Sequence, residues 1–373
     1  MRILAVNEGS SSLKLSVIGD GDETLATENI ALGSGADSDA HADSATRRLI
    51  QAHGPIDAAG HRIVHGGTEF TGPVLLTAPA LERIRALTDL APLHQAKSLH
   101  GVELVSRVLP DVPAVGCFDT AFHAHMPPAA STYALPQAWR TRWPLRRFGF
   151  HGLSHAWSSA RVAALLQRDV HELRIVTCHL GSGASLCAVH DGQSVDTTMG
   201  FTPLEGLVMA TRSGSVDPGL VLWLQQHAGV APSEVSDTLE NRSGVLGLAG
   251  TADMRAVVAS AAAGDERAGL AVDVYVHRLR AAIAAMAAGM NGLDALVFTG
   301  GVGEGSSEIR ARAAAGLGFL GVRLDAARNT GATGDSDIGA SDAEVRVFVI
   351  TAREDLEMAA QVRDVLAPVA RPS

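Results

Sequence analysis

The chain has 373 residues, 46% of them hydrophobic and 19% charged, with a formal net charge of −10. This length suits two domains with separate cores, and the negative charge without any Lys/Arg run argues against nucleic acid as a partner. No stretch approaches 18 uninterrupted apolar residues, the strand-like ILAV follows Met1-Arg2 directly, and the three cysteines are scattered without a CxxC pair, so we expect no membrane span, no export signal and a cytoplasmic location.

Short β-rich runs alternate with alanine-rich helical stretches along the chain, which predicts an α/β fold. The strand-like runs are ILAV, AVGCF, RIVTC, ALVFTG and VRVFVI. A helix is predicted over about 267–290, because Val272, Val276, Leu279, Ile283, Met286 and Met290 recur at steps of three and four. Gly, Ser, Asp and Thr in 33–46 and 329–342 predict surface loops.

An internal repeat links two distant segments. Displacing residues 3–20 by 172 positions lays ILAVNEGSSSLKLSVIGD over IVTCHLGSGASLCAVHDG without a gap. Each copy reads as strand, Gly/Ser turn, strand and tight turn, which is typical of a β-hairpin. The pair indicates either a duplicated domain or two unrelated hairpins. Small residues at the turns let backbone N–H groups approach a phosphate closely.

A third glycine turn, FTGGVGEG at 298–305, follows a buried strand and precedes a helical run, so it is a plausible nucleotide cradle. The chain has no GxxxxGK[ST] motif, and GLGFLG at 316–321 reads as a helix end with its loop. Arginines and histidines gather in 61–67, 146–155 and 211–219, which favours a buried anion. The two H-x3-H spacings in these segments lack a third metal ligand, so we interpret these histidines as structural or phosphate-contacting.

Ten motifs resemble those of the acetate kinase family, in that family's order. They are NEGSSSLK, HRIVHGG, APLH, FDTAFH, RRFGFHGLSH, HLGSGAS, DTTMGFTPLEGL, TRSGSVDPG, FTGGVGEG and AREDLEMA. The resemblance implies two duplicated ribonuclease-H-like (actin-like ATPase) domains with an inter-domain cleft. It also implies a discontinuous first domain, 1–123 plus 356–373, around a second, nucleotide-binding domain, 124–355.

The resemblance assigns roles position by position. It implies catalytic roles for Asp119, Arg62, Arg212 and His151, and a Mg²⁺ site at Asn7 and Glu354, with Asp119 also holding or orienting the ion. The implied acyl pocket comprises Arg62, Val64, Leu93, Phe150 and Pro203. The implied ATP and phosphate contacts are Asn7, Ser10, Ser12, Lys14, His179, Leu180, Gly181, Ser182, Gly183, Asp253, Met254, Arg255, Gly300, Gly301, Val302, Gly303 and Glu304.

The implied reaction is direct transfer of the ATP γ-phosphoryl group to acetate, giving acetyl phosphate and ADP, with Mg²⁺ (or Mn²⁺) as cofactor. A carboxylate is already ionised at pH 7, so the chemistry needs positioning and positive charge and no strong general base. The resemblance also suggests a homodimer. Propionate or butyrate kinase, and a non-catalytic nucleotide switch, remain the alternatives.

Five residues depart from the family pattern. Ser182 and Gly305 stand where asparagine is usual, Gln95-Ala96 replaces Asn-Pro, and Glu8 stands where a small residue is usual. A carboxylate beside a phosphate turn would repel the phosphate, so we expect strand alternation to turn Glu8 outward.

Overall fold

The computed structural model describes residues 1–9, 12–32 and 36–367, apart from the side chains of 36–39 and 92–94. Its contacts divide the chain into two compact units. Unit 1 comprises Met1–Ala124, Gly152–Trp157 and the chain from Arg353 onward, and unit 2 comprises His125–His151 and Ser158–Ala352. Each unit contains one six-stranded mixed sheet.

The sheet of unit 1 has the strand order β3-β2-β1-β4-β6-β5. Its strands are β1 (Ile3–Glu8), β2 (Ser12–Ile18), β3 (Thr24–Ala31), β4 (Ala58–Ile63), β5 (Val74–Leu75) and β6 (Ala114–Phe118). The β1-β2-β3 ribbon and the β5-β6 pair are antiparallel, whereas β1, β4 and β6 run parallel. The carboxyl ends of these three parallel strands therefore meet at one edge of the sheet.

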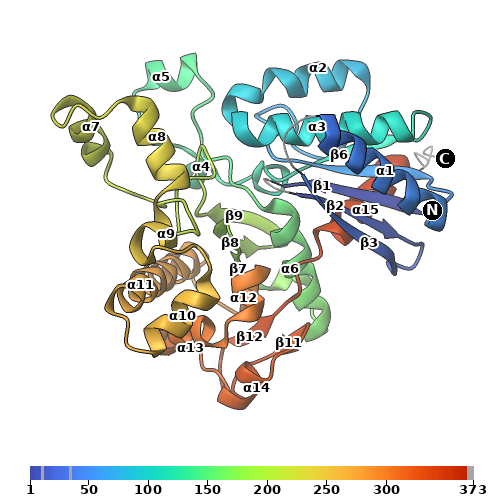
Figure 1. The fold of residues 1–373 in the computed structure, drawn as a ribbon. Helices are drawn as coiled ribbons and strands as arrows, with labels where there is room; N and C mark the ends of the chain where they lie inside the picture. The colour runs from blue at the N-terminus through green and yellow to red at the C-terminus, as the bar shows by residue number, and fades with distance from the viewer. Residues whose placement is uncertain (10–11, 33–35, 368–373) are drawn as a thin grey trace. The chain divides into compact units, whose positions relative to one another are not determined.

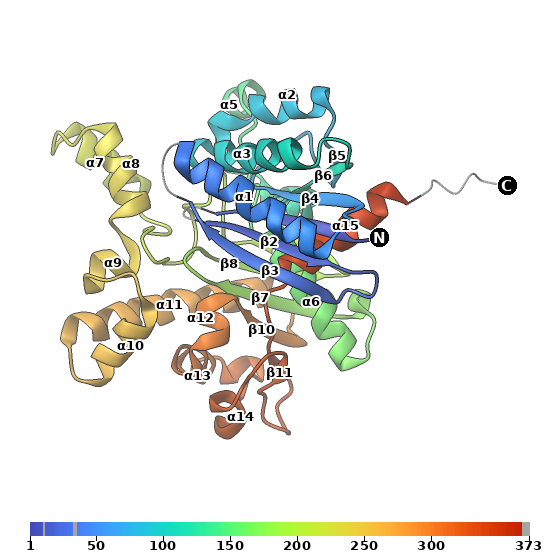
Figure 2. The same cartoon turned by 45° about the vertical axis from the view of Figure 1, so that its right-hand side comes forward.

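Helices cover both faces of this sheet (Figures 1 and 2). On one face, Leu4 and Val6 of β1 pack with α1 (Ala36–His53) and α3 (Pro92–Val108). On the other face, Ile3 and Ala5 pack with α15 (Glu354–Leu366). This alternation is the period of two expected for a strand buried on both sides. The remaining elements of the unit are α2 (Ala78–Ala86), η1 (Thr88–Leu90) and η2 (Ala121–His123).

The sheet of unit 2 repeats the strand order and the directions of the first sheet, as β9-β8-β7-β10-β12-β11. Its strands are β7 (Arg174–Leu180), β8 (Ala184–His190), β9 (Gln193–Thr197), β10 (Ala295–Thr299), β11 (Ser336–Asp337) and β12 (Arg346–Val349). The two segments of the sequence repeat form the corresponding hairpins β1-β2 and β7-β8. The topology therefore favours duplication over two unrelated hairpins.

The predicted helix over 267–290 is confirmed as α11 (Glu266–Gly289), whose buried face includes all the expected apolar residues except Met290, the buried C-cap. The other helices of unit 2 are α4 (Pro128–Ser131), α5 (Gln137–Arg142), η3 (Val170–Glu172), α7 (Pro218–Gln226), α8 (Pro232–Asn241), α9 (Gly244–Ala249), α10 (Met254–Ala262), α12 (Gly300–Gly305), α13 (Ser307–Ala315), η4 (Gly318–Leu320) and α14 (Ala326–Thr330). Helix α6 (Gly152–Leu166) contributes its first residues to unit 1 and the rest to unit 2.

The predicted surface loop over 33–46 is wrong for its described part, because residues 36–46 belong to α1. Ala42, Ala45 and Leu49 of this helix are buried against the sheet. Packing of these few small apolar side chains outweighs the weak helix preference of the aspartates and serines around them. Residues 33–35 lie outside the described residues.

One stretch of the described residues, Gly244–Ala262, is long and apolar enough to be a candidate membrane span. It forms two separate helices, α9 of 6 residues and α10 of 9 residues, interrupted at Gly250, whose φ is 80°. Helices of this length extend about 9 and 14 Å. Each is much shorter than a hydrocarbon core of about 30 Å.

Candidate active site

Arg62 of unit 1 is fixed by a carboxylate. It lies at the carboxyl end of β4, and its Nε and Nη2 donate to both oxygens of Asp119 at 2.6–3.1 Å. The Asp119 side chain is 1% exposed and follows β6, the parallel neighbour of β4. Burial alone would lower the pKa of Arg62, but the carboxylates of Asp119 and Glu354 outweigh it and raise this pKa. Arg62 therefore carries a permanent positive charge in a fixed orientation.

Asn7 connects Arg62 to Glu354. Its Oδ1 accepts from Nη1 of Arg62 at 3.1 Å, and its Nδ2 donates to Oε2 of Glu354 at 3.0 Å. Four residues thus come together from separate elements of unit 1. They are Asn7 of β1, Arg62 of β4, Asp119 after β6 and Glu354 at the start of α15. All four are residues predicted from the sequence to belong to one site.

This network is chemically suited to Mg²⁺, which binds proteins through one or two carboxylates and completes its shell with water and substrate phosphate oxygens. Both oxygens of Asp119 already accept from Arg62, whereas Oε1 of Glu354 has no hydrogen bond among the described residues. Of these carboxylates, Glu354 therefore has the oxygen that could bind a metal directly. The described residues contain no group of three or more His, Cys, Asp or Glu side chains arranged to hold a metal.

Two predicted phosphate contacts, Ser12 and Lys14, lie on β2, the strand that pairs with β1 and Asn7. Lys14 of β2 is exposed and pairs directly with Asn7 across the antiparallel ladder, so the two side chains share one face of the sheet. Ser12 is the first residue of β2, and Gly9 donates its N–H to the Ser12 carbonyl at 2.8 Å. Ser10 lies outside the described residues.

Glu8 does not turn outward to solvent. Its carboxylate is 5% exposed, and both oxygens lie 3.0 Å from Nδ1 of His100 on α3. Strand alternation places Glu8 on the opposite face from Asn7, but that face is covered by a helix, so the predicted outward orientation is wrong. His100 gives this carboxylate a partner away from the phosphate turn.

For the acyl pocket, Val64 is 7% exposed in unit 1, and the Leu93 side chain lies outside the described part of the chain.

Unit 2 brings three predicted residues around Gly183. His151 has a left-handed backbone (φ 56°) just before α6, and its Nδ1 lies 2.8 Å from Oγ of Ser185. Its ring stacks on His179 with centroids 4.4 Å apart. A Cβ on Gly183 would lie 3.2 Å from Nε2 of His151 and 3.5 Å from Nη1 of Arg212. Both side chains thus approach the backbone at Gly183, and any larger residue there would crowd His151.

Arg212 is also held in place. Its Nη1 donates to the Pro203 carbonyl at 2.9 Å and contacts Sδ of Met209. Phe150, immediately before His151, is 1% exposed. In unit 2 the predicted acyl-pocket residues Phe150 and Pro203 are therefore adjacent, in sequence or by a hydrogen bond, to the predicted catalytic residues His151 and Arg212.

A cavity of about 780 Å³ in unit 2 contains much of the predicted nucleotide site. Seven predicted residues line it, namely Gly181, Ser182, Asp253, Met254, Arg255, Gly301 and Val302. A volume of several hundred cubic ångströms is the usual size of a small-molecule site. Asp253 also has a structural role, because its side chain caps α10 by accepting from the Arg255 N–H at 3.0 Å.

Four other predicted nucleotide contacts lie at the end of β7 or in α12. Gly300 has φ 77°, and a Cβ there would lie about 3 Å from the backbone of Leu180, so glycine permits α12 to approach the end of β7. Glu304 accepts from the N–H groups of Gly300 and Ala352, both at 3.0 Å. Leu180 and Gly303 are buried. These four residues shape the phosphate turn, and none of them lines the cavity.

Several residues of unit 2 were not predicted from the sequence. Ala210, Thr211, Val245, Ala252, Tyr275 and Ser306 also line the cavity, and Gly305, noted only as a departure, lines it with Ser182. Tyr275 is 4% exposed, and its hydroxyl has no hydrogen-bond partner among the described residues. It lies on the buried face of α11, where its pattern indicated only core. Ser185, the partner of His151, lies at the end of the HLGSGAS motif. The sequence therefore offered a clearer signal for Ser185 than for Tyr275.

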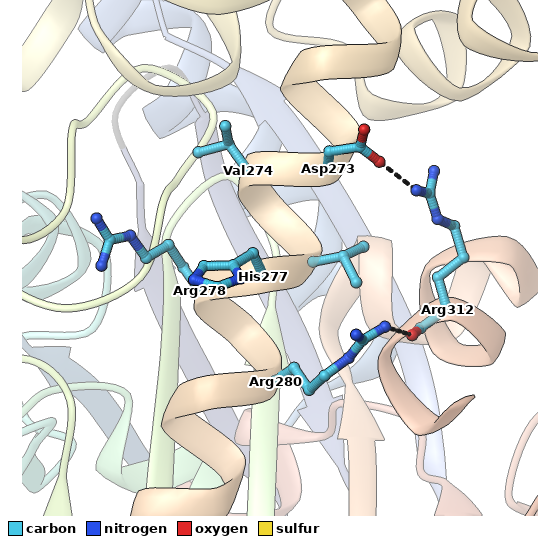
Figure 3. Close-up of a pocket in the computed structure, with 7 residues that line it drawn as sticks. Asp273, Val274, His277, Arg278, Arg280 and Arg312 are labelled. Atoms are coloured by element: carbon cyan, nitrogen blue, oxygen red, sulfur yellow. Dashed lines mark hydrogen bonds and ion pairs between the residues drawn. The ribbon is translucent and has the colours of Figure 1, made fainter. Parts of the chain in front are cut away.

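A second hollow of about 470 Å³ lies over α11 and α13 (Figure 3). Asp273 pairs with Arg312, and Arg280 donates to the Arg312 carbonyl at 2.5 Å. Arg278 points to the other side of α11. These contacts brace two helices, so we assign this hollow a structural role.

The chain is similar to known enzymes along most of its length. A family model described as the Acetokinase family matches residues 38–360. An acetate kinase from a Synechococcus species is 47% identical over 85% of this chain and 79% of its own. The Porphyromonas gingivalis acetate kinase structure has a TM-score of 0.90 and 34% identity, covering 98% of this chain and 99% of its own. A Francisella tularensis propionate kinase has a TM-score of 0.90 and 35% identity, covering 96% and 98% of the two chains.

These matches, with the repeated sheet topology, confirm the predicted fold class of two actin-like domains. The chain belongs to the acetokinase family.

Proposed function

We propose that the protein transfers the γ-phosphoryl group of ATP to the carboxylate of acetate, giving acetyl phosphate and ADP. The observation that carries the proposal is the approach of His151 and Arg212 to the Gly183 backbone in a chain of the acetokinase family. The acetate kinases among its relatives, at 47% identity, support acetate as the acceptor.

The acceptor requires no activation by a strong base. A carboxylate with an ordinary pKa is ionised at pH 7, so its oxygen is already nucleophilic. The protein must hold the acid in line with the γ-phosphorus and exclude water, which would otherwise compete as the acceptor. Arg62 is suited to bind the acid, because Asp119 fixes its planar guanidinium and keeps its charge permanent.

The second requirement is to neutralise the charge on the transferring phosphoryl group, and side chains of unit 2 are suited to this. In the tautomer in which the Ser185 hydroxyl donates to Nδ1 of His151, the ring carries its proton on Nε2, the atom nearest Gly183. Nε2–H of His151 and the Arg212 guanidinium would then donate to oxygens of the phosphoryl group. Preorganised donors of this kind stabilise the transition state of phosphoryl transfer without a covalent phosphoenzyme.

Mg²⁺ or Mn²⁺ would be held by Glu354 and Asn7, with Asp119 acting through Arg62 or through water. The chemistry that the ion supplies when bound is neutralisation of charge on the β- and γ-phosphate oxygens. Lys14, which shares a sheet face with Asn7, adds a further positive charge for the phosphates. The adenosine end would occupy the 780 Å³ cavity lined by Asp253, Met254 and Arg255.

The test is a hydroxamate assay with ATP, Mg²⁺ and a panel of acetate, propionate and butyrate. We expect acyl hydroxamate with the highest kcat/KM for acetate. A methylene in an apolar pocket is worth about 1–3 kcal/mol, so a preference of roughly 10-fold or more over propionate is the scale to expect. Higher kcat/KM for propionate would make the protein a propionate kinase, and ATP binding without any acyl hydroxamate would favour a nucleotide switch.

We propose further that the protein is a cytoplasmic homodimer. Helix α7 supports the dimer, because it is rich in apolar residues and none of its residues is buried within the chain. Its Leu220, Leu222 and Trp223 side chains are 47%, 52% and 54% exposed. Exposed apolar patches commonly mark an interface. Sedimentation should show a dimer that Trp223→Glu weakens, whereas the equally drastic Phe319→Glu at a 75% exposed position should leave the dimer intact.

A further inference from the structure

The loop of residues 198–207 provides the carbonyl that orients Arg212. Pro203 lies in this loop, and its C=O accepts from Nη1 of Arg212 at 2.9 Å. The loop, which runs on from the end of β9, contains no helix or strand of its own, and its first residue, Thr198, is hydrogen-bonded to Leu186 of β8. The position of the Arg212 guanidinium therefore depends on whatever keeps this loop in one conformation.

Three side chains outside the assigned site hold the loop. Arg147 donates from Nη2 to Oε1 of Glu205 at 2.7 Å and from Nη1 to the carbonyls of Thr198 and Met199, both at 3.1 Å. The Tyr133 hydroxyl donates to Oε2 of Glu205 at 2.5 Å. The same hydroxyl accepts from the Phe201 N–H at 2.9 Å. The network thus contacts the loop at its start (Thr198 and Met199), in its middle (Phe201) and near its end (Glu205).

The same contacts reach His151. The N–H groups of Phe148 and Gly149, which follow Arg147, donate to the Gly200 carbonyl at 3.0 and 3.3 Å. Two left-handed residues, Gly149 (φ 75°) and His151 (φ 56°), then turn the chain so that the imidazole meets Ser185. The loop carrying Pro203 and the segment carrying His151 are therefore joined by these backbone hydrogen bonds and by the Arg147 side chain.

Close packing leaves this network little freedom. The Arg147 side chain is 18% exposed and Glu205 is 34% exposed. A Cβ on Gly200 would collide with Glu205 and with the Tyr133 hydroxyl. Burial and the Glu205 carboxylate raise the pKa of Tyr133 to about 12, so the phenol keeps its proton and remains a donor at neutral pH.

We propose that Tyr133, Glu205 and Arg147 are positioning residues that jointly fix the Pro203 carbonyl beside Arg212 and the backbone before His151. This inference rests on the proposed phosphoryl transfer, in which Arg212 and His151 act on the phosphoryl group. None of the three positioning residues needs to touch a substrate. Their removal should therefore lower the rate of the chemical step and leave nucleotide binding almost unchanged.

Glu205→Gln and Tyr133→Phe are the test variants. A misplacement of about 1 Å can cost roughly 100-fold in rate, so we expect kcat to fall about 10- to 100-fold in each, with the KM for ATP within about twofold of the wild-type value. Asp273→Asn is the matched control, because it breaks the Asp273–Arg312 ion pair in the same unit without touching the loop. The control should keep the wild-type kcat.

A double-variant cycle with Arg212→Ala distinguishes positioning from general structural support. If Glu205 acts through Arg212, adding Glu205→Gln to Arg212→Ala should cause much less than its single-variant loss, with His151 accounting for the remainder. Losses that multiply fully in the double variant would overturn the proposal. So would a wild-type kcat in both Tyr133→Phe and Glu205→Gln.

Hydrogen exchange of the Phe201 amide gives a readout that does not require turnover. Tyr133→Phe should remove the acceptor of this N–H and speed its exchange, together with that of the surrounding loop. Wild-type exchange in both variants would overturn the proposal. If the wild-type protein formed no acyl phosphate, the proposed function would fail, while faster exchange in the variants would still support the network.

Discussion

Arg62→Lys tests whether the orientation of the guanidinium, and not only its charge, supports catalysis. Arg62 makes three contacts to the two oxygens of Asp119 and one to Asn7, using three different nitrogens. A lysine has one nitrogen and cannot reproduce this planar fork. Removing one preorganised donor from a transition state costs about 100- to 1,000-fold in kcat, or about 2.7–4 kcal/mol. We expect a loss of this size.

Lysine is preferred to alanine because Asp119 is 1% exposed. Alanine would leave that carboxylate buried without its partner, at a cost of about 3–5 kcal/mol in folding free energy. The hydroxamate assay measures kcat, and thermal unfolding checks that the variant is folded. Arg85→Lys, at a 49% exposed arginine paired with Glu103, is the matched control and should keep full activity. A folded Arg62→Lys enzyme with a wild-type kcat would refute the role of the fork.

The free energy of unfolding should fall as the pH drops from about 6.5 towards 4, because burial lowers the pKa of His61 and of His65 to about 4 and the unfolded chain then binds more protons. Each histidine contributes up to about 1.4 kcal/mol per pH unit in this window. Urea unfolding at a series of pH values should therefore show that the free energy of unfolding falls less steeply with decreasing pH for His61→Asn than for the wild type. The same dependence on pH in both proteins would contradict the burial effect. Tyr275→Phe should weaken ATP binding about three- to tenfold in calorimetry without lowering the melting temperature, since the buried hydroxyl has no partner among the described residues and is available to the nucleotide; equal affinity would contradict this. Glu354→Gln should raise the Mg²⁺ concentration needed for half-maximal activity, and an identical Mg²⁺ titration would remove Glu354 from the metal site.

Features that depend on short-range pattern could be predicted from the sequence. The helical period of three and four residues located α11. The internal repeat, whose two copies lie 172 positions apart, located the two corresponding hairpins. The motif resemblance identified the family and grouped Asn7, Arg62, Asp119 and Glu354, which the fold of unit 1 places in direct contact.

Features that depend on packing could not be predicted. Residues 36–46 lack a strong helical pattern, and only burial of Ala42 and Ala45 against the sheet reveals the helix. Glu8 looked out of place beside a phosphate turn, because its partner His100 is 92 residues away in sequence. Tyr133 lies in none of the ten motifs, and Glu205, although part of DTTMGFTPLEGL, has no role assigned from the resemblance; their relation to Arg212 emerges through a backbone carbonyl.

The most direct test of the central claim, transfer of phosphoryl from ATP to a carboxylate oxygen, is the fate of an ¹⁸O label. The protein should convert ATP and ¹⁸O-labelled acetate, in the presence of Mg²⁺, into acetyl phosphate whose phosphorus carries the label in the bridging oxygen, detected by its ³¹P isotope shift. ADP should appear in equal amount. Acetyl phosphate without the label at phosphorus, or ADP with inorganic phosphate alone, would contradict the account.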